Sequence, residues 1–451
     1  MTVATTWIRT LPQRHGRRTL ILLALIALLG LGVRAYAVAR PVANPADDSH
    51  AYYALSKALY EEGSFGGPSF HDSSDWSPGA PLLYAAAFYA TGGPREGTAR
   101  IVEALLGVAA ILVVFLLGER LGGRWVGLMA AFAVAVYPPF IHSTGELMSE
   151  PPAILTLPAA VLAFLWASER ERLRAWLLPG FLFGLTAMFR PEYLFVGAAF
   201  VILAAIQVGR ARDWKPGLAG AGLLAAALLL PIVPWTIRNI DALGRVVPIS
   251  TGSGKALYVG TFLPADGEYQ RVKALLYERY DHKSLPPNSE ALNAVDPTPL
   301  FNRAAARYPE LPRDSALGKI GKQNFSKYFG EDPGGYLAMT ARKVGRMWSS
   351  GVGAAMSSGL GRAIQILLVA LGLAGLVLLG RRGSWWELVA LATPVALVTA
   401  VGAASLAAPR RNEVLMTLVF PLAALTLSRC GAAISSGSRW PSPKQESSPP
   451  N

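Results

Sequence analysis

Two adjacent carboxylates lie in the stretch Asn44-Pro45-Ala46-Asp47-Asp48-Ser49-His50-Ala51-Tyr52-Tyr53, which follows an apolar run from Thr19 to about Ala39. A run of about 20 apolar residues is long enough to cross the hydrocarbon core of a bilayer as a helix. Charges beside such a segment are costly unless a function retains them there. The stretch therefore predicts a membrane protein with a reactive centre at the mouth of its first membrane helix.

The composition agrees with a protein that crosses the membrane several times. Of the 451 residues, 52% are hydrophobic and only 16% are charged, whereas soluble domains carry about 25% charged residues. A net charge of +13 would suggest nucleic-acid binding in a soluble chain, but here it is explained by Lys and Arg retained in cytoplasmic loops. No nucleic-acid partner is expected. Cys430 is the only cysteine, so no intrachain disulfide can form.

Nine further apolar runs follow the first, and together they predict an all-α polytopic membrane protein with about ten transmembrane helices. These runs cover residues 101–118, 125–141, 152–167, 175–189, 193–209, 216–236, 363–380, 387–407 and 413–428. Basic residues fall on every second connection, which places those connections and both termini in the cytoplasm. We therefore expect a multi-pass protein of the cell (plasma or inner) membrane, with its candidate site on the extracytoplasmic side.

The pattern divides the chain into five regions. They are a basic cytoplasmic N-terminus (1–18), a membrane module with outward acidic loops (19–239), an extracytoplasmic loop or subdomain (240–361), C-terminal membrane helices (362–429) and a disordered cytoplasmic tail (430–451). The first outward loop contains apolar and aromatic stretches, such as residues 78–89, that predict interfacial helices. The tail is rich in Ser and Pro and offers no core.

Three outward carboxylates are candidate catalytic residues. Asp47 and Asp48 could take a proton from an acceptor or bind a divalent cation through their oxygens, and the alternative is that they only favour the start of a helix. Glu150 precedes two prolines suited to a first helical turn, so it would lie at the mouth of a membrane helix; the alternative is a charge that faces water. No cofactor is certain, and a divalent cation stays open.

Four arginines lie at predicted outer helix ends, on the side that topology disfavours for basic residues. They are Arg190, Arg238, Arg410 and Arg411. A guanidinium group can donate two parallel hydrogen bonds to phosphate oxygens, and in a low-dielectric pocket it would stabilise a departing phosphate. These arginines are therefore candidates for binding a phosphate-bearing lipid, with anchoring to lipid head groups as the alternative.

Two further patterns carry little weight. His50, His71 and His142 are outward but match no zinc-site spacing. Gly252-Ser253-Gly254-Lys255 resembles the end of a phosphate loop but lacks the preceding pattern of a nucleotide-binding motif.

Short motifs follow one another in a fixed order along the chain, most densely before Gly260. They are Val33-Arg34-Ala35-Tyr36, Asp48 four residues before Tyr52, Ser77-Pro78-Gly79-Ala80-Pro81-Leu82-Leu83, Met148-Ser149-Glu150-Pro151, Phe189-Arg190-Pro191-Glu192, Pro234-Trp235-Thr236-Ile237-Arg238-Asn239 and Val247-Pro248-Ile249-Ser250-Thr251. In this order, residues 20–430 resemble the GT-C polytopic glycosyltransferases, the group of the protein O-mannosyltransferases and the lipid A aminoarabinose transferases.

The resemblance implies transfer of a hexosyl or pentosyl group from a polyprenyl-phosphate donor to a lipid, glycan or protein acceptor at the outer face, with inversion at the anomeric carbon. It implies that Asp48 is the catalytic carboxylate, with Asp47 beside it and Glu150 as a second acidic residue. Two departures leave the donor-phosphate contacts open. Ser77 stands where relatives have a basic residue, and Arg410-Arg411-Asn412 stands where many have an Arg-Tyr pair.

A transporter or flippase for a lipid-linked saccharide is the alternative function, because it would use the same arginines and the same cavity. Charges buried in the middle of membrane helices would favour that alternative. The sequence contains few such charges, and it has a large outward segment, so it favours the enzyme.

Overall fold

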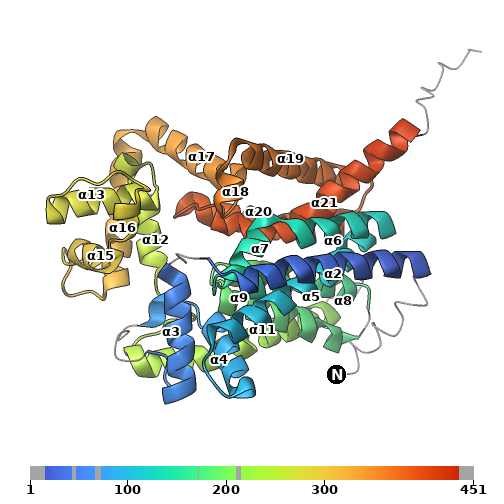
Figure 1. Cartoon of the computed structure of the whole chain (residues 1–451), viewed down its shortest axis with the longest axis horizontal. Helices are drawn as coiled ribbons and strands as arrows, with labels where there is room; N and C mark the ends of the chain where they lie inside the picture. Colours follow the sequence, from blue (N-terminus) through green and yellow to red (C-terminus); the bar gives the residue numbers. More distant parts are fainter. Residues whose placement is uncertain (1–15, 43–46, 67–72, 171, 210–214, 436–451) are drawn as a thin grey trace, which may run out of the picture.

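The computed structural model describes residues 16–42, 47–66, 73–170, 172–209 and 215–435, and these residues form helices and connections without a strand. Long helices lie side by side along the long axis of the molecule, and shorter helices gather at one end (Figure 1). The predicted all-α fold is confirmed.

Each of the ten predicted apolar runs coincides with a helix or, in one case, with a bent pair of helices. These are α2 (Arg17–Ala39), α5 (Glu96–Gly122), α6 (Arg124–Val136) with α7 (Pro138–Gly145), α8 (Glu150–Ala167), α9 (Leu177–Phe189), α10 (Tyr193–Gly209), α11 (Lys215–Leu243), α19 (Gly359–Arg381), α20 (Trp385–Ala404) and α21 (Arg410–Ser435).

Length and hydropathy agree with a multi-pass protein. Among the described residues, seven helices are long and apolar enough to cross a membrane, and the pair α6 and α7, bent by 43°, makes an eighth. The other two runs, α9 and α10, form shorter apolar helices. Leu25 and Leu28 of α2 are 56% and 63% exposed, which suits contact with lipid chains rather than water. The polytopic prediction is confirmed.

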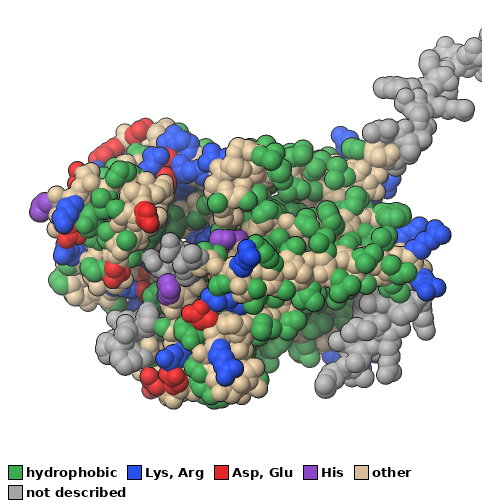
Figure 2. Space-filling model, in the orientation of Figure 1, with side chains coloured by type: hydrophobic (Ala, Val, Ile, Leu, Met, Phe, Trp, Pro, Cys, Tyr) green, Lys and Arg blue, Asp and Glu red, His purple; other side chains and the backbone are tan. Residues whose placement is uncertain are grey.

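Charge is distributed unevenly along the molecule. The described chain ends, the start of α2 and the end of α21, lie at one end of the long helices (Figure 1). On the face shown in Figure 2, hydrophobic side chains cover the long helices, whereas Asp and Glu gather at the opposite end. This pattern agrees with the predicted topology. The assignment of sides remains a prediction.

The helix α5 lies in the middle of the long helices, packed against α2, α6, α8 and α21. Its Gly118 faces Gly127 of α6 so closely that a Cβ atom added to Gly118 would lie 3.0 Å from the Gly127 Cα. Small residues allow membrane helices to approach in this way. The close packing fixes the end of α5 relative to α6.

The bend between α6 and α7 is stabilised by an arginine from another helix. Pro138 begins α7, and a proline cannot donate the backbone hydrogen bond that would continue α6. Arg34 of α2, fully buried, donates instead to the carbonyl oxygens of Val134 (3.1 Å) and Ala135 (3.3 Å). The guanidinium group of Arg34 therefore supplies hydrogen bonds to backbone carbonyl oxygens near the bend.

The loop that the sequence predicts as the first outward one contains α3 (Asp47–Glu62), the short 3-10 helix η1 (Ser73–Asp75) and α4 (Gly79–Thr91). The ring of Phe88 on α4 makes edge-to-face contacts with Tyr53 and Tyr60 of α3. Such aromatic contacts fix one helix against the other. Helices are thus present where the sequence predicts interfacial ones, and their depth in a membrane remains a prediction.

The segment between α11 and α19 contains a group of helices with a hydrophobic core of its own. They are α12 (Ser253–Gly260), η3 (Leu263–Ala265), α13 (Tyr269–Asp281), α14 (Glu290–Asn293), α15 (Pro297–Ala305), α16 (Arg313–Glu331), α17 (Pro333–Ser349) and α18 (Ala354–Ser357). Val272, Phe301 and Leu317, from three of these helices, are almost fully buried in this core. We refer to residues 253–349 as the subdomain.

One lysine connects the subdomain to the long helices. Lys343 of α17 is fully buried, and its Nζ donates to the carbonyl oxygens of Gly260 (2.7 Å), Ala403 (2.9 Å) and Ser405 (3.0 Å). A buried ammonium group requires such partners. The end of α12 and the end of α20 are thereby held at one point.

Candidate active site

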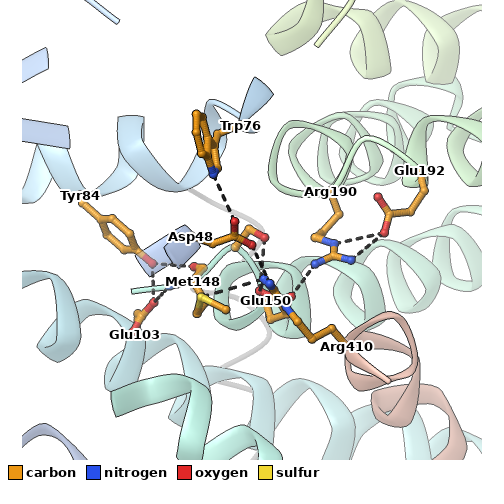
Figure 3. Close-up of polar contacts among 10 residues, drawn as sticks. Asp48, Trp76, Tyr84, Glu103, Met148, Glu150, Arg190, Glu192 and Arg410 are labelled. Atoms are coloured by element: carbon orange, nitrogen blue, oxygen red, sulfur yellow. Dashed lines mark hydrogen bonds and ion pairs between the residues drawn. The ribbon is translucent and has the colours of Figure 1, made fainter. Parts of the chain in front are cut away.

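Four segments that are far apart in the sequence bring charged side chains together at their ends (Figure 3). Asp48 lies in the first turn of α3, Glu150 begins α8, and Arg410 begins α21. Arg190 lies in the short connection between α9 and α10. The N-terminus of a helix favours a carboxylate, which explains the places of Asp48 and Glu150.

Arg410 lies at the centre of this cluster. Its Nη1 donates to Asp48 Oδ2 (2.6 Å), its Nε to Glu150 Oε1 (2.8 Å) and its Nη2 to Glu150 Oε2 (3.2 Å). The two bonds to Glu150 form the paired geometry in which arginine binds carboxylates most strongly. Arg410 therefore links α3, α8 and α21.

A second arginine extends the cluster. Arg190 Nη1 donates to Glu150 Oε1, and its Nη2 lies 2.8 Å from Glu192 Oε1. Burial alone would raise the pKa of Glu192, but the charges of Arg190 and Arg411 lower it to about 2. Glu192 is thus ionised at neutral pH and balances the arginines beside it.

The carboxylates differ in access to solvent. The Glu150 side chain is 1% exposed, whereas the Asp48 side chain is 39% exposed. Asp48 Oδ1 also accepts a hydrogen bond from Trp76 Nε1 (3.3 Å). Burial would raise the pKa of Asp48, but the charge and hydrogen bond of Arg410, assisted by Lys255 and Trp76, lower it. Asp48 is therefore an accessible, ionised carboxylate.

A third buried carboxyl lies beside the cluster. Glu103 of α5 is fully buried, and its Oε1 accepts a hydrogen bond from the Met148 backbone N–H (3.0 Å). The hydroxyl oxygen of Tyr84, on α4, lies within hydrogen-bond distance of Glu103 Oε1 and 2.7 Å from the Met148 carbonyl oxygen. This contact fixes the backbone two residues before Glu150.

The structure brings together most, but not all, of the predicted site residues. Arg411 is close enough for its charge to act on Glu192. Arg238 lies elsewhere, since it donates to the Phe65 carbonyl oxygen (2.6 Å) and packs against the rings of Phe65 and Trp235. The side chain of Asp47 lies outside the described residues.

The described residues offer no group of three or more metal-ligating side chains. Both oxygens of Asp48 accept hydrogen bonds from Trp76 and Arg410, and both oxygens of Glu150 accept from Arg410. The carboxylates that a divalent cation would need are thus already paired. Of the candidate histidines, His142 lies 3.9 Å from Glu146, and His71 is outside the described residues.

Sequence reasoning missed Glu103, Trp76 as a hydrogen-bond donor to Asp48, and any role for Glu192. A signal for Glu103 was present, because it is a lone carboxyl within the apolar run 101–118, where an ionisable residue is costly. Glu192 stands in a quoted motif beside Arg190. Nothing in the sequence indicates which nitrogen or oxygen each side chain contacts.

Residues 75–235 match the family model of the dolichyl-phosphate-mannose-protein mannosyltransferases. This segment contains Glu103, Glu150, Arg190 and Glu192. No curated protein sequence matches the chain.

Among solved structures, the chain is similar to the oligosaccharyltransferase AglB of Archaeoglobus fulgidus in complex with an inhibitory peptide and a dolichol-phosphate. The TM-score is 0.54 at 15% identity, over 94% of this chain and 52% of the other. The apo form of the A. fulgidus oligosaccharyltransferase gives a TM-score of 0.56 at 15% identity, over 93% and 52% of the two chains. The chain has the GT-C fold. It spans about half the length of these archaeal enzymes.

ArnT from Cupriavidus metallidurans bound to undecaprenyl phosphate is a more distant structural relative, with a TM-score of 0.39 at 14% identity, over 92% of this chain and 79% of the other. The shared fold rests on the archaeal structures, and it agrees with the fold that the ordered motifs predict. In this chain, the cluster of Asp48, Glu150, Arg190 and Arg410 is formed by the motifs that carry the resemblance, together with the start of the last helix.

Proposed function

We propose that this protein transfers a sugar from a polyprenyl-phosphate donor to an acceptor at the outer ends of its membrane helices. The observation that carries the proposal is the partly exposed, ionised Asp48 at the edge of a buried cluster of arginines and carboxylates. The match to a dolichyl-phosphate-mannose enzyme family and the fold shared with an enzyme solved with dolichol-phosphate support the class of donor.

Asp48 is the proposed base because a base must reach the proton that it abstracts. An acceptor hydroxyl or amine can approach its exposed side chain. In the proposed step, the acceptor atom forms a bond to the anomeric carbon, and its proton passes to Asp48. The bond from the anomeric carbon to the phosphate oxygen breaks at the same time, and the phosphate leaves with the electron pair. A single displacement inverts the anomeric centre.

Glu150 has a different role in this proposal. At 1% exposure, its carboxylate cannot meet a substrate without rearrangement. It instead holds Arg410 and Arg190 in place through charge-assisted hydrogen bonds. Rigid support of this kind keeps the reacting groups in a productive geometry.

The charge balance of the cluster bears on the donor phosphate. Asp48, Glu150 and Glu192 form ion pairs with Arg190 and Arg410, and the buried Glu413 lies close enough for the charge of Glu150 to act on it. Arg411 forms no ion pair with a described residue, and its buried Nη1 has no hydrogen-bond partner. A phosphate therefore needs either an arginine, free or released from its carboxylate, or a further cation. Arg190, Arg410 and Arg411 remain the candidates for the first way, and Arg238, which lies elsewhere, is the weakest of the four.

Lys255 is the cation that we propose for the second way. The Thr251 backbone N–H donates to the Ser74 carbonyl oxygen (2.7 Å), which fixes the start of α12 against η1, next to Trp76. Lys255 lies four residues after Thr251, and its Nζ lies 6.0 Å from the centre of the Phe301 ring, with no ion pair to a described residue. Its charge contributes to the lowered pKa of Asp48. Lys255 can therefore face a phosphate bound beside Asp48.

The transporter alternative gains one observation from the structure, since Arg34 and Glu103 are ionisable residues buried within membrane helices. Their contacts count against a transport path. Arg34 donates to backbone carbonyl oxygens near the bend of α6, and Glu103 bonds to the Met148 backbone. Both side chains serve the packing of neighbouring segments.

Release of free polyprenyl phosphate tests the proposal. The purified full-length protein would be offered a panel of polyprenyl-phosphate sugars with crude membrane acceptors. We expect release with one donor, and Asp48→Asn should lower it about 100-fold to 10,000-fold, the usual contribution of a general base.

Asp266→Asn is the matched control, because Asp266, like Asp48, is an aspartate paired with arginine, but it lies in the subdomain. It should leave release unchanged. Saturable donor binding without release, equal in wild type and Asp48→Asn, would instead identify a transporter.

A further inference from the structure

Glu103 is a buried carboxyl for which the proposed reaction has no use. It is fully buried on α5 and forms no ion pair with any described residue. Arg100, one turn earlier on the same helix, pairs with Glu96 at 2.6 Å. An isolated carboxylate in such a place carries a large desolvation cost.

The hydrogen atoms available around Glu103 indicate its protonation state. The Tyr84 hydroxyl oxygen contacts two oxygens, Glu103 Oε1 and the Met148 carbonyl oxygen. A hydroxyl group has one hydrogen to donate, and a backbone carbonyl can only accept. If the Tyr84 hydroxyl donates its hydrogen to the Met148 carbonyl oxygen, it has none left for Glu103. The contact between Tyr84 and Glu103 is then a hydrogen bond only when Glu103 is protonated and donates to the Tyr84 oxygen.

The same arrangement satisfies the remaining donor. The Met148 backbone N–H also points to Glu103 Oε1, and a protonated carboxyl oxygen can donate one hydrogen while it accepts another. An ionised Glu103 would leave the two acceptors to share one hydroxyl hydrogen. Its second oxygen, Oε2, is buried without a hydrogen-bond partner, which is a much smaller cost for a neutral carboxyl than for an anion.

These contacts act on the segment that leads to Glu150. Both backbone groups of Met148 are held, the N–H by Glu103 and the carbonyl oxygen by Tyr84. The preceding residue is held as well, because the Leu147 N–H donates to Ser49 Oγ (3.0 Å), next to Asp48 on α3. The chain therefore enters α8 at a fixed position.

We propose that Glu103 is a neutral carboxylic acid that positions the segment from Met148 to Glu150, and through it the arginines of the active site. It does not touch the reacting atoms, so it is a positioning residue. Its effect on catalysis rests on the proposed function, whereas its protonation can be measured without any turnover.

Infrared spectroscopy of the full-length protein in lipid nanodiscs tests the protonation. The difference spectrum between wild type and Glu103→Gln should contain the carbonyl stretch of a protonated carboxyl group at neutral pH. Tyr84→Phe should shift that band, because it removes the hydroxyl that the acid contacts. Glu96→Gln is the matched control on the same helix, and it should leave the band in place.

Kinetics test the positioning. Glu103→Gln keeps a neutral group of the same shape and should retain transfer within about threefold of wild type. Glu103→Leu removes every hydrogen bond and should lower kcat about 10-fold to 100-fold with little change in KM, as expected for a displaced catalytic group. Thermal unfolding would show whether Glu103→Leu remains folded, and Glu103→Gln and Tyr84→Phe keep the test valid if it does not.

The outcomes separate the two proposals. A spectrum with a carboxylate band and no protonated carboxyl would overturn the inference, even in a protein that transfers sugar. A protonated band in a protein that transfers no sugar would overturn the proposed function and leave the assignment of a neutral Glu103 standing. Equal kcat values for wild type and a folded Glu103→Leu would show that Glu103 does not position the site.

Discussion

Among the described residues, two networks of more than one ion pair join an aspartate to arginine, and they differ in which member faces solvent. In the subdomain, Asp266 accepts hydrogen bonds from Arg342 and Arg346, and its own side chain is only 14% exposed, while that of Arg342 is 55% exposed. At the candidate active site the order is reversed, since the Asp48 side chain is 39% exposed and the Glu150 carboxylate behind it is almost fully buried.

The reach of the two clusters differs as well. Asp266 joins the end of η3 to α17. Arg410, in contrast, contacts Glu150, which lies 260 positions earlier in the chain, and Asp48, which lies 362 positions earlier. Ion pairs by themselves therefore do not mark a site. What distinguishes the cluster at the candidate active site is that distant elements converge on one accessible carboxylate.

Removal of Arg410 should have the largest effect in this comparison. Arg410→Leu leaves Asp48 without its main partner and Glu150 buried with Arg190 alone. Loss of one partner of a buried pair costs about 3–5 kcal/mol, so we expect the free energy of unfolding to fall by that order and transfer to be lost. Chemical unfolding in mixed detergent micelles measures the first and release of polyprenyl phosphate the second.

Arg342→Leu in the subdomain is the control for this experiment. It removes an arginine from an exposed pair and should change neither measurement appreciably. Similar losses in both variants would mean that the clusters do not differ in the way described.

A smaller effect is expected from Lys255→Gln on the pH dependence of transfer. In the proposed reaction the carboxylate form of Asp48 is the active one, so we expect transfer above the pKa of Asp48 and its loss as pH falls through that pKa. Arg410 and Lys255 lower that pKa, and loss of the Lys255 charge should raise it. The acid limb of the kcat/KM profile should therefore move to higher pH.

The exposed Lys322 of α16 provides the matched control, and Lys322→Gln should leave the acid limb in place. The same pKa direction governs stability. The contribution of the Asp48 ion pair is present above the pKa of Asp48 in the unfolded chain and is lost as pH falls toward the lower value in the folded protein. An acid limb identical in wild type and Lys255→Gln would place Lys255 too far from Asp48 to matter.

The smallest effect should come from Asp266→Asn. The pair that it breaks is partly exposed and local, and such pairs contribute little. We expect transfer within about twofold of wild type and a slightly lower melting temperature, measured by thermal unfolding in detergent. A large loss of transfer would show that the subdomain cluster, too, acts on the site.

Much of the fold could be predicted from the sequence, because hydrophobic length is a direct physical requirement of a bilayer. All ten apolar runs are helical, and the outward segment forms helices with their own core. The bend at Pro138 and the capping role of Arg34 were not predicted. They depend on contacts between α2 and α6 that one sequence does not contain.

The candidate site was predicted in its members but not in its contacts. Asp48, Glu150, Arg190 and Arg410 were each singled out, and the structure places them together. The sequence suggested arginines open to phosphate, whereas the structure pairs Arg190 and Arg410 with carboxylates. Arg238 was grouped with them because it also ends a helix, but the direction in which a helix end faces is set by packing.

Lys343 has a mechanical consequence for how the subdomain can move. A motion that pulls α12 away from the end of α20 breaks either the hydrogen bond from Lys343 to Gly260 or the two from Lys343 to Ala403 and Ser405, each worth roughly 1.5–3 kcal/mol. The hydrogen bond from the Thr251 backbone N–H to Ser74 holds the start of α12 against η1, so α12 is tethered at both ends. Lys255 therefore keeps its place relative to Asp48 unless one of these tethers breaks.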